Sequence, residues 1–147
     1  MTLAEEYSLP GLEQIRERIV QDPFACFLGV ELLELREGYS KTTITVGEHM
    51  LNFMDLLHGG VIFSLADIAF SAACNSYGQV AVALNVSINF LDAVQAGTRL
   101  YATATEESRG RRTALYRLAV TTEGGTLVAL CHGTAYHKNR APAIKGQ

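Results

Sequence analysis

The sequence predicts an α+β protein in which an antiparallel sheet wraps around one buried helix. Residues 59–74 form a strongly apolar segment with almost no polar face, which is typical of a helix covered by protein on most sides. Residues 79–91 alternate between two kinds of side chain with the period of a strand. Turn residues separate the apolar runs that follow, so the second half reads as hairpins. A curved antiparallel sheet of two strands before the helix and four after it would supply the cover that the helix needs.

The chain before the central helix contains two short helical segments and a hairpin. Apolar residues recur at helical spacing in residues 11–21, and Asp22 with Pro23 forms a cap and first turn for a second helix, which ends at Gly29. The hairpin has β-prone runs at residues 30–36 and 39–46. Residues 1–22 are therefore expected to form an N-terminal helical extension.

The central helix is expected to begin at the Gly59-Gly60 pair and to end at the turn formers of residues 75–78. Its polar positions are spaced three, four and four residues apart and share one stripe: Ser64, Asp67, Ser71 and Asn75. Asp67 is the only charge. The stripe either faces water or carries a functional carboxylate.

The remaining strands are expected at residues 79–91, 97–106, 112–122 and 126–137. Strict alternation in the first of them places Val80, Val82, Leu84, Val86, Ile88 and Phe90 on one face and Ala81, Ala83, Asn85, Ser87 and Asn89 on the other. Residues 139–147 are expected to form a flexible tail.

Composition excludes several classes of function. The formal net charge is −3, so no global positive field exists to hold nucleic acid or an anionic membrane. Asp67 interrupts the only long apolar run, and no secretory signal is visible at the N-terminus. The three cysteines lie far apart in apolar runs, which favours reduced core thiols and a cytoplasmic location. The histidines show no zinc-ligand spacing, so neither a metal nor a cofactor is expected.

The start of the central helix is a candidate oxyanion site. Gly59 and Gly60 allow close approach of a substrate, and the first helical N–H groups have no intrahelical partners. Asp67 lies seven residues beyond Gly60, about 10 Å along the helix axis. One helix would therefore struggle to bring its own amide and carboxylate to the same carbon. A second helix running antiparallel across a two-fold axis solves this, so we expect two sites in an isologous dimer. His58 has no partner serine and is expected to fix the loop.

A basic turn follows the fourth predicted strand. Arg109, Arg111 and Arg112 surround Gly110, which describes either an ordinary solvated hairpin or a local phosphate site.

The segment His58-Gly59-Gly60 together with Leu65-Ala66-Asp67 and Asn75-Ser76 resembles the hotdog-fold acyl-CoA thioesterases, above all the phenylacetic acid degradation subgroup. The similarity extends from about residue 24 to residue 137. It implies that residues 23–138 form a single hotdog domain, with subunits joined through sheet edges into a dimer and often into a dimer of dimers.

The resemblance also implies roles for individual residues. Asp67 would act as nucleophile or general base, the Gly59 amide would polarise the thioester carbonyl, Asn52 would contact the reacting region and His58 would support the turn. Substrate and coenzyme A contacts would fall on Gly60, Phe90, Arg109, Gly110, Arg111, Arg112 and Thr113, with His137 a weaker candidate. Two positions depart from the family pattern: Asp55 stands where relatives often have Gly, and Ala83 where some have a Ser or Thr that assists hydrolysis.

The predicted function is hydrolysis of an aryl- or medium-chain acyl-CoA to free acid and coenzyme A. The alternatives are a non-catalytic acyl-CoA binding module and a hotdog hydratase or dehydratase. Five side chains either line the acyl pocket or belong to the core: Phe53, Met54, Phe63, Phe70 and Tyr77.

Overall fold

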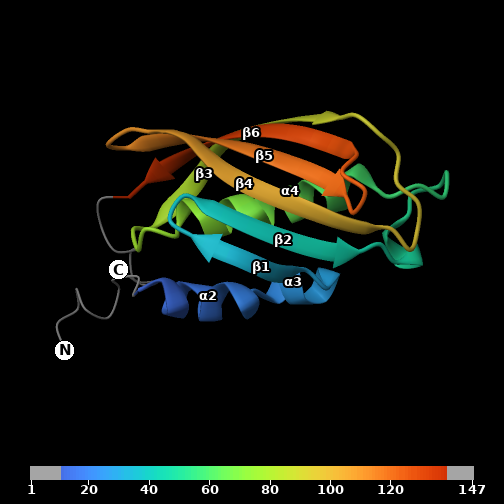
Figure 1. Cartoon of the computed structure of the whole chain (residues 1–147), viewed down its shortest axis with the longest axis horizontal. Coiled ribbons are helices and arrows are strands. Elements are labelled where there is room, and N and C mark those ends of the chain that lie inside the picture. Colours follow the sequence, from blue (N-terminus) through green and yellow to red (C-terminus); the bar gives the residue numbers. More distant parts are fainter. Residues whose placement is uncertain (1–10, 139–147) are drawn as a thin grey trace, which may run out of the picture.

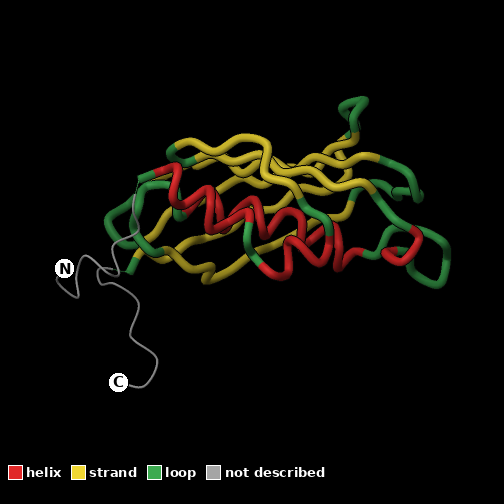
Figure 2. The backbone as a smooth tube through the Cα atoms, turned by 90° about the horizontal axis from the view of Figure 1, so that it is seen from below, coloured by secondary structure: helices red, strands yellow, loops and turns green. Residues whose placement is uncertain are grey.

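The computed structural model describes residues 11–138, and the expected flexible tail at residues 139–147 lies outside them. The order of the α-helices and strands is the predicted one, and a short 3₁₀ helix, η1, is additional: α2 (Leu12–Val20), α3 (Pro23–Leu28), β1 (Glu31–Arg36), β2 (Tyr39–Thr45), η1 (Glu48–Met50), α4 (Gly59–Cys74), β3 (Ala81–Phe90), β4 (Arg99–Arg109), β5 (Thr113–Thr122) and β6 (Leu127–His137). The six strands form one antiparallel sheet in the order β1-β2-β4-β5-β6-β3. Figure 1 shows α4 lying along the concave side of this sheet, and Figure 2 shows the helices together on that side.

Burial of its apolar side chains against the sheet determines the position of α4. Leu65, Ala69 and Ala73 are fully buried against the sheet, and the Phe70 ring stacks on Tyr116 with centroids 5.4 Å apart. Phe70 also lies directly on Gly133 of β6, where any Cβ would overlap its ring. Each large apolar side chain buried in this way contributes about 1.5–3 kcal/mol, so packing rather than helix propensity sets the position of α4.

The strict alternation predicted for β3 is wrong at one point. A β-bulge between Ala83 and Asn85 shifts the register of β3 on β6. Ala83 pairs with Ala135 before the bulge and Val86 pairs with Gly133 after it, so Ala81 and Ala83 face α4 together with Val86, Ile88 and Phe90. The extra residue reverses the phase of the pattern, and Ala83 consequently faces the helix.

The N-terminal segment covers the C-terminal half of α4 beside β1. Ile15 of α2 is buried in a small cluster with Leu35 and Ala72. Asp22 caps α3 as predicted, with its Oδ1 accepting the N–H groups of Phe24 and Ala25 at 3.0 and 2.9 Å.

The prediction of three core thiols is wrong for Cys26, which is exposed because it lies on the outer side of the short helix α3. Cys74 and Cys131 are buried and free as expected. Among residues 11–138, no helix has the length and apolar character needed to cross a membrane.

Candidate active site

The loop before α4 is organised by the side chain of Asn52. Its Oδ1 accepts the backbone N–H groups of Met54 and Leu56 at 2.9 and 3.2 Å, and a bridge between Leu51 and Leu57 closes the loop. Asp55 has φ 59°, the only positive φ of a non-glycine residue in the described chain. Asp tolerates this left-handed conformation better than most residues. The position therefore suits a residue that can adopt a positive φ. This explains why Asp55 can stand where relatives often have Gly.

His58 caps the helix that follows. Its Nδ1 accepts the N–H of Gly60 at 3.0 Å, so Nδ1 is the capping acceptor and Nε2 is left free of this contact. The N–H of Gly59 donates to no group within residues 11–138. One of the first two helical amides is thus committed and the other is available at the positive end of the helix dipole.

Phe90 lies against this helix start. Its ring is so close that a Cβ built on Gly59 would approach two ring carbons to 3.2 Å. Because Phe90 belongs to the end of the edge strand β3, the structure brings together two predicted site residues that are far apart in the sequence.

Asp67 is half-buried two turns further along α4. Burial raises the pKa of its carboxyl above the ordinary value, and the negative charge of Asp22 raises it further. Asp22 is predicted from the sequence only as a cap, because its approach to Asp67 depends on how the segment between α2 and α3 lies against α4 in the folded chain.

A cavity of about 230 Å³ opens beside Asp67 between α4 and β3. Its walls include Ser71, Cys74 and Ala83. Burial raises the pKa of the Cys74 thiol to about 12, so no reactive thiolate is present there at neutral pH. The carboxylate of Asp67 is the ionisable group in this cavity that suits nucleophilic or general-base chemistry.

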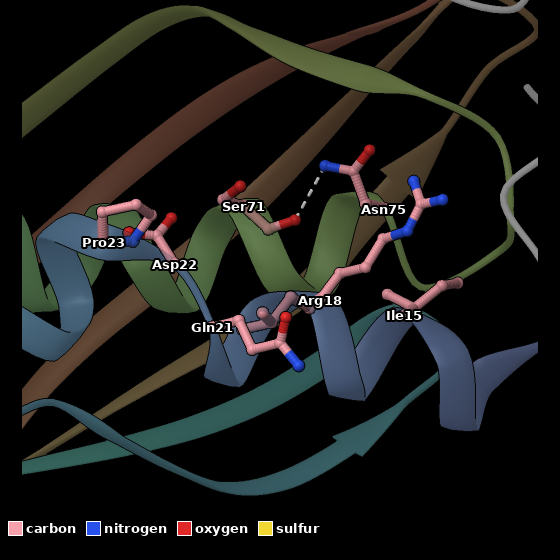
Figure 3. Close-up of a pocket in the computed structure, with 8 residues that line it drawn as sticks. Ile15, Arg18, Gln21, Asp22, Pro23, Ser71 and Asn75 are labelled. Carbon is pink, nitrogen blue, oxygen red and sulfur yellow. Dashed lines mark hydrogen bonds between the residues drawn. The ribbon is translucent and has the colours of Figure 1, made fainter.

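A second and larger cavity, of about 480 Å³, lies between the N-terminal helices and α4. Figure 3 shows Asp22 and Arg18 on one side of it, with Ser71 of α4 and Asn75, which caps the C-terminus of α4, on the other. Ser71 lines both cavities. The two spaces are therefore neighbours along the helix.

The basic hairpin lies at the opposite end of α4 from Gly59. The guanidinium of Arg109 stacks 3.5 Å from the ring centroid of Tyr77, which follows the C-terminus of α4, and lies 3.7 Å from the Glu106 carboxylate. Gly110 donates its N–H to the Thr113 carbonyl at 2.8 Å, which closes the turn. Arg111 and Arg112 are exposed at its tip. Arg109 is therefore held by neighbours, whereas the two other arginines are open to solvent.

The predicted CoA-binding residues consequently form two groups in one chain. Gly60 and Phe90 lie at the N-terminal end of α4 with Asn52, His58 and Gly59. The hairpin of residues 109–113 lies at the other end, and a helix of 16 residues is about 24 Å long. His137, the weaker candidate, is fully buried near this hairpin, and neither of its ring nitrogens has a hydrogen-bond partner within the described residues. Burial and the charge of Arg109 lower the pKa of His137, while Glu106 opposes them.

The predicted acyl-pocket residues do not gather in one place either. Phe53 and Met54 are exposed on the loop before α4, with 95% and 58% of their surface accessible, whereas Phe70 belongs to the core and Tyr77 lies under Arg109. Figure 1 shows the loop reaching past the end of the sheet. No cluster of side chains suited to hold a metal ion occurs within residues 11–138.

Residues 54–129 match the family model described as the thioesterase superfamily. The chain belongs to the thioesterase superfamily. It is 40% identical over 115 residues to the acyl-coenzyme A thioesterase PaaI of Escherichia coli, an alignment that covers 78% of this chain and 82% of that protein. It is 43% identical over 112 residues to a putative esterase of Archaeoglobus fulgidus, covering 76% of this chain and 73% of that one.

Solved structures agree with this assignment to the superfamily. The E. coli PaaI structure superimposes with a TM-score of 0.85 at 33% identity, covering 95% of this chain and 99% of that chain. A hypothetical thioesterase protein of Streptococcus pneumoniae, solved with coenzyme A, gives a TM-score of 0.78 at 26% identity, covering 84% of this chain and 97% of that chain. The protein is thus a hotdog-fold thioester hydrolase, as its sequence predicts.

Proposed function

We propose that this enzyme hydrolyses an aryl- or medium-chain acyl-CoA to the free acid and coenzyme A. The observation that carries the proposal is the difference between the first two amides of α4. The Gly60 N–H donates to His58, whereas the Gly59 N–H remains available to a substrate. A preorganised amide of this kind stabilises the oxyanion of a tetrahedral intermediate. The relative in E. coli is named an acyl-CoA thioesterase and the S. pneumoniae neighbour was solved with coenzyme A, which supports this choice of substrate class.

Asp67 supplies the second half of the chemistry as nucleophile or general base. Because its pKa is raised, the Asp67 carboxylate is a stronger base than an exposed carboxylate. It is still ionised when the pH of the solution is well above that pKa. The oxyanion donor and Asp67 are eight positions apart on one helix, about 12 Å along its axis. Both groups therefore cannot serve one carbonyl carbon from the same chain.

A two-fold dimer joins the two halves. The edge strand β3 carries exposed apolar side chains, among them Val82 and Leu84, and its outer edge has no strand beside it within residues 11–138. Pairing β3 with β3 of a second copy would continue the sheet and run the two α4 helices antiparallel. Gly59 of one subunit would then face Asp67 of the other, and two such dimers would form the dimer of dimers.

The same dimer brings the basic hairpin to the site. The hairpin lies at the C-terminal end of α4, so in an antiparallel pair it approaches the Gly59 end of the partner helix. Arg111 and Arg112 would contact the phosphates of coenzyme A together with the turn amides near Gly110 and Thr113. Arg109 would shape the hairpin from its place between Tyr77 and Glu106.

The acyl group would extend from Asp67 past Ser71 toward the larger cavity. About 480 Å³ between the N-terminal helices and α4 is enough for an aromatic ring or a medium-length chain. This location gives the described part of the N-terminal extension, residues 11–22, a part in substrate selection beside the single domain of residues 23–138.

Thioester hydrolysis with a panel of phenylacetyl-, hydroxybenzoyl- and straight-chain acyl-CoA esters tests the proposal. Loss of thioester absorbance is the suitable signal, because exposed Cys26 would react with a thiol reagent. Wild type should turn over at least one ester, and Asp67→Ala and Asp67→Asn should lose about 10²-fold or more of kcat while remaining folded. Binding of the esters without turnover would instead support the acyl-CoA binding module, and addition of water to an enoyl-CoA would support a hydratase.

A further inference from the structure

Two cavities border the helix α2, in addition to the one beside Asp67. The first, of about 480 Å³, lies between the N-terminal helices and α4, and we call it the outer cavity. The second, of about 250 Å³, is lined by residues of α2, α3, β1, β2 and α4, and we call it the inner cavity. Figure 1 shows α2 running alongside β1, so the inner cavity lies between the N-terminal helices and this edge of the sheet.

The walls of the two cavities differ in their chemistry. Five polar side chains line the outer cavity: Arg18, Gln21, Asp22, Ser71 and Asn75. The walls of the inner cavity are mostly apolar, and they include Val20, Ala25, Val30, Leu32 and Ile68. Of the two polar residues there, Glu31 is exposed and Thr42 donates its hydroxyl to the Leu65 carbonyl at 3.4 Å. The inner cavity therefore suits the hydrocarbon end of a ligand rather than a polar group.

Ile19 separates the outer cavity from the inner one. Among residues 11–138 it is the one side chain that lines both of them. It lies one helical turn after Ile15 and shares the inward face of α2. There it is partly buried against the cluster that Ile15 forms with Leu35 and Ala72. Because its side chain borders both spaces, shortening Ile19 would join them.

We infer that Ile19 determines how long an acyl group this enzyme accepts. The inference rests on the proposed function, which directs the acyl group past Ser71 into the outer cavity. Ile19 closes the outer cavity on the side of the sheet, so an aryl group or a chain that ends there fits. A longer chain meets the Ile19 side chain and leaves its last methylenes unburied. The inner cavity is space that the acyl group does not enter in the wild type.

The volume of the inner cavity sets the size of the expected effect. An apolar cavity of about 150 Å³ is large enough to hold benzene. The inner cavity, at about 250 Å³, thus has room for about four to six carbons of a chain. Each methylene that moves from water into apolar surroundings contributes about fourfold to an equilibrium. Access to the inner cavity should therefore raise kcat/KM of the newly admitted esters about tenfold or more.

The test measures kcat/KM for saturated straight-chain acyl-CoA esters of increasing length, and for the phenylacetyl ester, by loss of thioester absorbance. In wild type the value should fall beyond a limiting chain length. Ile19→Ala should move that limit up by about four to six carbons and change the phenylacetyl ester little. Ile19→Val should shift it in the same direction by less, and it keeps the test open should Ile19→Ala fail to fold.

Leu12→Ala is the matched control. Leu12 packs on the same cluster from the same helix but lines neither cavity. Its truncation should lower stability about as much as Ile19→Ala does, yet leave the ratio of long-chain to short-chain kcat/KM as in wild type. This ratio is the decisive quantity, because a purely structural loss at Ile19 lowers the rates of all esters by the same factor.

Refilling the inner cavity tests the direction of the chain. Val30 is partly buried and lines the inner cavity alone, so Val30→Phe should leave the wild-type profile unchanged and should cancel the gain of Ile19→Ala in the double variant. The inference is overturned if Ile19→Ala and Ile19→Val keep the wild-type limit, or if Val30→Phe by itself shortens it, because the chain would then already enter the inner cavity. Failure of the proposed function is distinct, since wild type itself would release no coenzyme A from any ester.

Discussion

Replacement of His58 separates a structural role from a chemical one. His58→Ala removes the acceptor of the Gly60 N–H and leaves that donor at the exposed first turn of α4. Loss of a helix N-cap costs about 1 kcal/mol, with extremes of about 0.5 and 2, which for a domain of this size lowers Tm by about 3–5 °C. Fraying of the first turn also displaces the Gly59 N–H. Because a small misplacement at a reacting centre has large effects, kcat should fall about tenfold or more.

His58→Asn tests whether capping explains the whole effect. Asn is among the preferred N-cap residues and accepts through its side-chain oxygen, so it should restore Tm and most of kcat. Thermal unfolding and ester hydrolysis are measured on the same preparations. His132→Ala is the control, since the side chain of that histidine is exposed on β6 and lies far from the start of α4 in the sequence. If His58→Asn has the Tm of wild type and yet is as inactive as Asp67→Asn, the imidazole takes part in the chemistry and the capping argument is refuted.

Four further predictions concern charge and backbone. Since activity needs ionised Asp67 and the charge of Asp22 raises its pKa, Asp22→Asn should move the acid limb of the kcat profile to lower pH; an unchanged limb would remove Asp22 from the site. Folding disfavours ionised Asp67 because burial, and after it the charge of Asp22, raises the pKa of its carboxyl, so Asp67→Asn should gain stability over wild type as the pH rises through the acid range, which chemical denaturation at several pH values checks. At φ 59° Asp55→Val should cost about 1–2 kcal/mol whereas Asp55→Gly is tolerated, and equal stabilities would show that the strain is absent. Arg111→Gln with Arg112→Gln should raise KM for CoA esters several-fold but leave a pantetheine thioester that lacks the nucleotide phosphates unaffected; parallel losses on both would place the hairpin outside the phosphate site.

The sequence predicted best where local chemistry decides the structure. The start of α4 follows from the histidine and two glycines, its end from the turn formers after Cys74, and the Asp22 cap from the proline beside it. The fold followed because a helix that is apolar all round leaves few architectures that can bury it.

Features that depend on tertiary pairing were missed. The β3 bulge at residues 83–85 depends on how β3 meets β6, so an alternating sequence alone could not reveal it. Asp22 raises the pKa of Asp67, and the Arg109 guanidinium stacks on Tyr77, although in both pairs the residues are far apart in the sequence. The exposure of Cys26 depends on which side of α3 packs inward. These features modify the surroundings of the site. The motif that locates the site, His58-Gly59-Gly60 with Asp67, could be recognised from the sequence alone.

The most direct test of the shared site is complementation between two inactive variants. Gly59→Pro removes the N–H donor at the first helical position, where proline is favoured, and the extended His58 backbone at φ −64°, ψ 132° suits a following proline. Gly59→Pro and Asp67→Asn should each lose about 10²-fold of activity or more as separate proteins.

When the two variants are co-expressed in equal amounts, random pairing makes about half of the dimers mixed, and each mixed dimer has one intact site. The account predicts recovery of about a quarter of wild-type activity. If the mixture is no more active than its separate components, although mixed dimers are recovered through two different affinity tags, then Gly59 and Asp67 act within one chain and the shared site is wrong.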